Sequence, residues 1–135
     1  MKIRFMPIAL MFLALASTAL ILSLPALAHH SSAAFDLQHP VTVKGKVTQF
    51  DWANPHAFIY LDVKNDKGGV DQWRVEANSP NMLSRVGWNR EIIKPGDEIS
   101  VTGAPAKNGT TVMRLANVVL PDGKKMDGQG FNYGH

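Results

Sequence analysis

Histidines near the start of the chain are the residues best suited to binding a metal ion. Residues 26–28 read Ala-Leu-Ala, a pattern typical of a signal-peptidase cleavage site, and His29 follows directly. Cleavage there would leave His29 as the first residue, so that its α-amine and imidazole could chelate one ion. His56 would supply a third nitrogen, with His30 and His39 as alternatives, and all-nitrogen tetragonal sites favour Cu(II). We therefore expect a copper or other divalent-metal site formed by His29, His56 and His30. The competing interpretation is a solvated terminus at which the adjacent histidines bind copper weakly.

A second group of residues is suited to holding an organic ligand. In the segment 56–63 the side chains of His56, Phe58 and Tyr60 fall on one face of an expected strand, because successive residues of a strand point to opposite sides. Trp52 and Asn54 come just before it. Aromatic rings on the face of a small barrel stack on bases, sugars or other planar groups. We expect a ligand site formed by Trp52, Asn54, Phe58 and Tyr60. The alternative is that these rings cover one end of the barrel.

Catalysis is not indicated by any motif. The sequence has no Gly-x-Ser-x-Gly elbow, no His-Glu-x-x-His pair and no phosphate-cradling glycine loop after a strand. It has no cysteine, which excludes disulfides, thiolate metal ligands and cysteine catalysis. The sequence therefore favours a binding or accessory module over an enzyme, with an unidentified protein or small molecule as its partner.

The N-terminal residues indicate export. Lys2 and Arg4 precede an almost wholly apolar stretch at 5–24, and small residues follow at 26 and 28. This is the pattern of a secretory signal peptide, and an uncleaved membrane anchor is the alternative. We expect 1–28 to be removed and the protein to be periplasmic or secreted, meeting the membrane only before cleavage. The chain has 14 basic and 11 acidic residues, and losing Lys2 and Arg4 leaves 12 against 11. A net charge of +1 gives little reason to bind nucleic acid.

The remaining pattern predicts an all-β domain. Alternating β-type residues indicate strands at 41–52, 56–65, 70–77, 98–103 and 110–120, with turns rich in Gly, Pro, Asn and Asp between them. Ser79-Pro80 followed by an apolar face predicts one short helix between the third and fourth strands. Five strands in this order indicate an OB-fold-like barrel, with a β-sandwich as the alternative. We expect a lead-in segment at 29–40, the barrel domain at 41–123 and a flexible Gly-rich tail at 124–135.

Several motifs resemble a known family of small exported bacterial proteins. They are the Ala-His-His-Ser-Ser-Ala-Ala-Phe-Asp start at 28–36, Trp-Ala-Asn-Pro-His at 52–56, Trp-Arg-Val-Glu at 73–76, Ser-Pro-Asn at 79–81 and Lys-Pro-Gly-Asp at 94–97. Together they resemble domain of unknown function 6152. The resemblance implies an OB-like periplasmic domain and supplies no activity.

Overall fold

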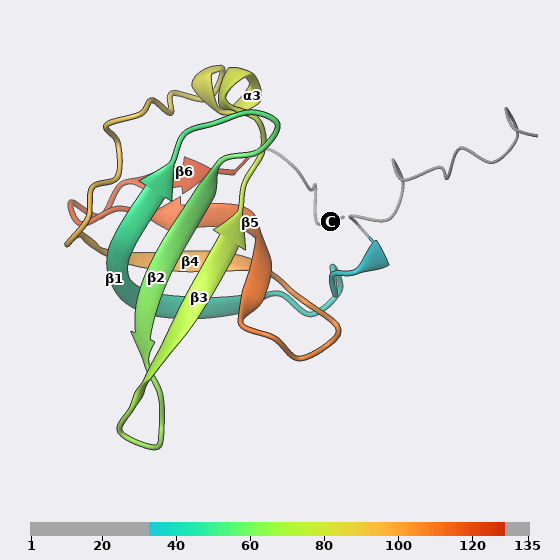
Figure 1. Ribbon diagram of the computed structural model, residues 1–135. Helices are drawn as coiled ribbons and strands as arrows, with labels where there is room; N and C mark the ends of the chain where they lie inside the picture. The colour runs from blue at the N-terminus through green and yellow to red at the C-terminus, as the bar shows by residue number, and fades with distance from the viewer. Residues whose placement is uncertain (1–32, 129–135) are drawn as a thin grey trace, which may run out of the picture. The chain divides into compact units, whose positions relative to one another are not determined.

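The computed structural model describes residues 33–128, drawn in colour in Figure 1. Within this range the chain forms six strands and one short helix, which are β1 (Val41–Asp51), β2 (Phe58–Lys64), β3 (Val70–Glu76), α3 (Pro80–Ser84), β4 (Glu98–Pro105), β5 (Val112–Val119) and β6 (Lys125–Asp127). No helix in these residues is long and apolar enough to cross a lipid bilayer.

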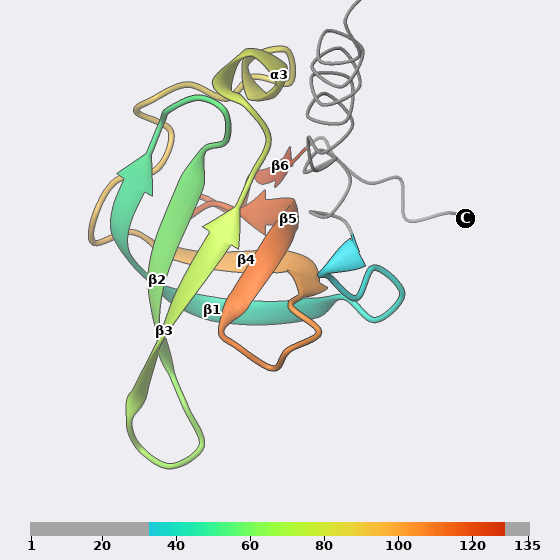
Figure 2. The ribbon, with the colours of Figure 1, turned by 45° about the vertical axis from the view of Figure 1, so that its right-hand side comes forward.

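Five of the strands close into a barrel. The order along the sheet is β3-β2-β1-β4-β5, and β3 also pairs with β5 in parallel, which joins the two ends. All other pairings among these five strands are antiparallel. Strand β1 is long and curved, so that it pairs with β2 along one half and with β4 along the other (Figures 1 and 2). This connectivity confirms the predicted all-β barrel with one short helix and is consistent with an OB-fold-like barrel.

The curvature of β1 has a local cause. At Gly45 an added Cβ would lie only 2.6 Å from the carbonyl oxygen of Asp62, so this position requires a residue without a side chain. A register shift between Val47 and Gln49 then adds one residue to β1 relative to β2. Such bulges bend a strand and increase its twist. The bend therefore falls where β1 passes from pairing with β4 to pairing with β2.

The core fills the barrel with the inward side chains of every strand. Its largest fully buried members include Ile59 and Leu61 from β2, Ile99 from β4 and Met113 from β5. Helix α3 lies over one end of the barrel, and its single buried residue, Leu83, is part of the same core. Alternation along the strands therefore separates an apolar interior from a polar exterior, as the sequence predicts.

Two segments outside the predicted barrel also pair with it. Phe35 forms an isolated bridge with Ala106, which attaches the lead-in segment to the end of β4. Residues Lys125–Asp127 form β6 beside β5, with Met126 buried. The expected barrel boundary at 123 and the expected flexible tail from 124 are therefore corrected, because β6 extends the sheet to Asp127. The rest of the expected tail, 129–135, and the expected signal peptide, 1–28, lie outside the described residues.

Candidate ligand-binding site

The outward side of β1, β2 and β3 carries most of the residues that could bind a ligand. We call this side the outer face. The strand register arranges its side chains in three cross-strand rows, which are Lys46–Asp62–Gln72, Gln49–Tyr60–Arg74 and Asp51–Phe58–Glu76.

The β1–β2 connection forms one wall of a depression at the end of the outer face. Trp52, Asn54, His56 and Phe58 line this depression of about 420 Å³, and Arg90 reaches it from the segment after α3. We call it the Trp52 depression. The ring of Trp52 is half-buried and meets Phe50 edge-on, with the ring centroids 5.7 Å apart. Three of the four residues expected to bind a ligand therefore line one depression, together with His56.

Backbone hydrogen bonds hold the start of β2 in place. The N–H of Ala57 donates to the carbonyl of Asn78 at 3.1 Å, and the N–H of Ala77 donates to the carbonyl of Ala57 at 2.9 Å. The Asn54–Pro55 peptide bond just before this point is cis. The two hydrogen bonds fix His56 beside the last residue of β3.

His56 belongs to a polar network on the edge of the Trp52 depression. Its Nδ1 contacts Glu76 Oε1, and the guanidinium of Arg114 donates to the same oxygen at 3.5 Å. Arg114 also donates to Asn78 Oδ1 at 3.5 Å. With its proton on Nδ1 the imidazole donates to the carboxylate, and Nε2 is then an acceptor or a metal ligand. Nε2 has no hydrogen-bond partner within residues 33–128.

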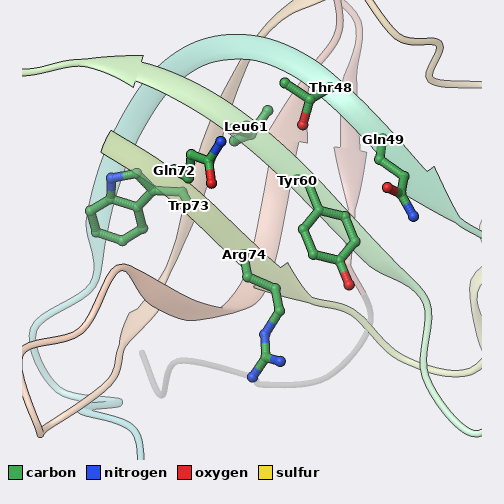
Figure 3. Close-up of a pocket in the computed structure, with 7 residues that line it drawn as sticks. All are labelled: Thr48, Gln49, Tyr60, Leu61, Gln72, Trp73 and Arg74. Carbon is green, nitrogen blue, oxygen red and sulfur yellow. The ribbon is translucent and has the colours of Figure 1, made fainter. Parts of the chain in front are cut away.

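Tyr60, the fourth expected residue, lies in a neighbouring depression of about 370 Å³. We call it the Tyr60 depression. In Figure 3 the side chains of Gln49, Tyr60 and Arg74 extend from β1, β2 and β3. The guanidinium of Arg74 lies 5.5 Å from the centroid of the Phe58 ring, a cation–π distance, and the Phe58 and Tyr60 ring centroids are 6.5 Å apart. Phe58 therefore connects the two depressions.

Of the three residues expected to bind a metal, the structure describes only His56. His29 and His30 lie outside the described residues. Within 33–128 no group of three or more histidine or acidic side chains is arranged to hold a metal ion. A further histidine, His39, shares a hydrogen bond of 2.9 Å with Asp36 on the lead-in segment. This contact lowers the pKa of the Asp36 carboxyl below its ordinary value.

Sequence reasoning missed several charged residues of the site. Sequence patterns assign no binding role to Arg74, Glu76, Arg90 or Arg114. Alternation along β3 predicts that Arg74 and Glu76 share a face with Gln72. The sequence does not show that this face lies beside Phe58 and Tyr60 of β2, which follows from the strand register. No sequence pattern marks Arg90, because the segment that brings it to the depression has no regular secondary structure.

Comparison with known proteins identifies a family. A family model described as "Family of unknown function (DUF6152)" matches residues 16–114. No curated protein matches the chain. Among solved structures, a crystal structure of TiaS in complex with a transfer RNA and ATP has 20% sequence identity and a TM-score of 0.44, covering 61% of this chain. The chain spans only 18% of the length of that protein.

Proposed function

The chain belongs to the family of unknown function DUF6152, and we propose that it is an exported, non-catalytic binding module whose ligand occupies the outer face of the barrel. Export is inferred from the signal-peptide pattern of residues 1–28, which predicts a periplasmic or secreted protein.

One observation carries the proposal. Trp52, Asn54 and Phe58, chosen from the sequence for their chemistry, line the same depression, and Tyr60 lines the next one. The three rings are half-buried, so each has one part fixed by packing and another part open to solvent. Half-exposed aromatic rings with neighbouring polar groups are typical of ligand sites, because they offer apolar area at small entropic cost.

Two of the three tryptophans of the chain provide a direct test. The indole N–H of Trp88 donates to the carbonyl of Asp127 at 2.8 Å, and its side chain is buried, whereas Trp52 lines the depression. Separate NMR signals for these indoles would be followed while single-ring fragments (benzoate, phenol, glucose and glucuronate) are added to the 15N-labelled protein. We expect at least one fragment to shift the Trp52 signal and leave Trp88 unchanged.

Two variants test the specificity of that shift. Phe58→Ala removes a ring from the wall of the depression and should abolish the response. Met82→Ala truncates an exposed apolar side chain on α3 that lines neither depression, and should leave it unchanged. If no fragment moves the Trp52 signal, or if Phe58→Ala responds as the parent does, the proposal is refuted.

Metal binding is the second candidate function, because the contact between Glu76 and His56 resembles the arrangement around metal-binding histidines. A carboxylate that contacts one ring nitrogen of a histidine orients the ring and makes the other nitrogen a better metal ligand. Glu76 stands in this relation to His56. Nε2 of His56, together with the α-amine and imidazole of His29 in the processed chain, would supply three nitrogens for Cu(II), and His30 is an alternative donor.

A Cu(II) titration of protein produced by export tests this candidate. A version with one extra residue before His29 and the variant His56→Ala are the comparisons. Tight one-to-one binding by the parent, clearly weakened in both comparisons, is the expected result. Equal, weak binding in all three would refute it.

A further inference from the structure

The outer face has a third depression in line with the two already described. Lys44, Lys46 and Lys64 line it, together with Asp62 and Glu98, and it encloses about 480 Å³. We call it the lysine depression. The residues that β1 contributes to the three depressions follow one another in sequence, being 44–46, then 48–49, then 50–51. The three depressions therefore form one track along β1.

The track is long. Lys64 in the lysine depression and Phe58 in the Trp52 depression are six steps apart on β2, which is roughly 20 Å at about 3.3 Å per residue. A ligand of one ring would fill a single depression. Three depressions in line fit an oligomer.

Positive charge is concentrated on this track. Five basic and three acidic residues line the three depressions, whereas the other residues of 33–128 include seven basic and eight acidic ones. The basic residues are Lys44, Lys46, Lys64, Arg74 and Arg90, and the acidic residues are Asp51, Asp62 and Glu98. An excess of cations over so short a length attracts an anionic ligand.

The polar groups between the charges select for hydroxyls. Thr48, Gln49, Tyr60 and Gln72 in the Tyr60 depression provide both donors and acceptors. Asp62 lines the lysine depression and adds a carboxylate acceptor there. A sugar hydroxyl can donate a hydrogen bond to such a carboxylate, whereas the phosphodiester groups of a nucleic acid offer only acceptors and negative charge.

We propose that the outer face binds a linear acidic oligosaccharide, of the uronic-acid class, along the track from the lysine depression to the Trp52 depression. The inference rests on the proposed function, since it names the ligand class of the same site. Carboxylates of the sugar would pair with the lysines, Asp62 would accept from a hydroxyl, and Tyr60 and Phe58 would contact sugar rings.

Calorimetric titration of the protein with defined oligomers tests the proposal. The probes are the hexamers of galacturonate and mannuronate, the galacturonate dimer, the methyl-esterified galacturonate hexamer, a ten-residue oligothymidylate and hexaglutamate. At least one uronate hexamer should bind about tenfold more tightly than the dimer, a difference equivalent to about 1.4 kcal/mol. Esterification, which removes the charge and keeps the ring, should weaken binding by a similar factor.

Matched variants identify the surface. Replacing Lys44, Lys46 and Lys64 with glutamine should weaken binding of the hexamer about tenfold, because each exposed ion pair contributes up to about 1 kcal/mol. The control replaces three exposed lysines that line none of the three depressions, Lys94, Lys107 and Lys124, and should bind as the parent does. Tyr60→Ala should also weaken binding, and amide NMR spectra would establish that each variant is folded.

Several outcomes would overturn the proposal. They are no binding of either uronate hexamer, equal affinity for hexaglutamate or the ester, tighter binding of oligothymidylate, or equal losses in the two lysine triples. If the uronates fail while fragments still shift the Trp52 indole signal, only the ligand class is wrong. If both experiments fail, the proposed function fails as well.

Discussion

Replacing Gly103 with alanine should be among the most damaging single changes to this barrel. Gly103 lies at a register shift between β4 and β5, where the two backbones come unusually close. An added Cβ would lie 2.3 Å from the carbonyl oxygen of Arg114 and 3.0 Å from Met113 Sδ. Ordinary contact begins at about 3.4 Å, so the neighbouring backbone would have to move by about 1 Å.

The cost follows from what must move. The atom in the way belongs to the backbone of β5, which pairs with β4 on one side and closes the barrel against β3 on the other. Forcing an extra group into a packed interior costs about 1–3 kcal/mol, and we expect the upper end because no flexible side chain can yield. A loss of about 3 kcal/mol lowers Tm by about 12–24 °C in a domain of this size.

Urea and thermal unfolding of Gly103→Ala, followed by circular dichroism, would measure this loss. The matched control is Gly69→Ala, whose added Cβ would meet only the side chain of Asn65, at 3.3 Å. That control should stay within about 1 kcal/mol of the parent, the range of Gly-to-Ala effects at compatible positions. Because Arg114 also contacts Glu76, Gly103→Ala should weaken ligand binding at the outer face too. If its stability falls within about 1 kcal/mol of the parent, the argument from close backbone approach is wrong.

Three other predictions concern single side chains. Leu83→Ala should cost about 2–5 kcal/mol in urea unfolding, because Leu83 is fully buried and is the one residue of α3 that is part of the core. His39→Ala should raise the pKa of the Asp36 carboxyl toward its ordinary value in an NMR titration, because the hydrogen bond from His39 lowers that pKa. The small stabilisation from this pair is fully present above the ordinary pKa and is lost as the pH falls through the lowered pKa. An unchanged pKa of Asp36 in the variant would contradict the contact. Glu76→Gln should change the 15N tautomer signature of the His56 ring, because the glutamine amide offers a weaker acceptor than the carboxylate, whereas an unchanged spectrum would mean that Glu76 does not set the tautomer.

The strands of the barrel were predictable because each leaves a period-two pattern. Phe58, Tyr60 and Asp62 alternate with the buried residues of β2, so one face of that strand was identified from the sequence. The short strand β6 was not identified, because three residues carry no period that a pattern can detect.

The site was predictable only along one segment of chain. Trp52, Asn54 and Phe58 lie within seven residues of one another, and their shared depression follows from the local hairpin. The partners that complete it come from distant segments. Glu76 is 20 positions from His56, and Arg114 is 38 positions from Glu76. Such pairs depend on strand order and register, which a single sequence with several short strands does not determine.

Closure of the barrel also bears on how quickly the protein folds. The hydroxyls of Thr42 and Thr102 are 2.8 Å apart and 60 positions apart in the chain, and β3 meets β5 across a separation of 38. Contacts between such distant positions give the fold a high contact order, and domains of this kind fold in milliseconds to seconds rather than microseconds. Strand β1 has both of its partners only once β4 has formed, and the barrel closes only when β5 pairs with β3. Truncations that remove β5 should therefore yield a chain without a stable barrel, however intact the hairpin that carries the candidate site.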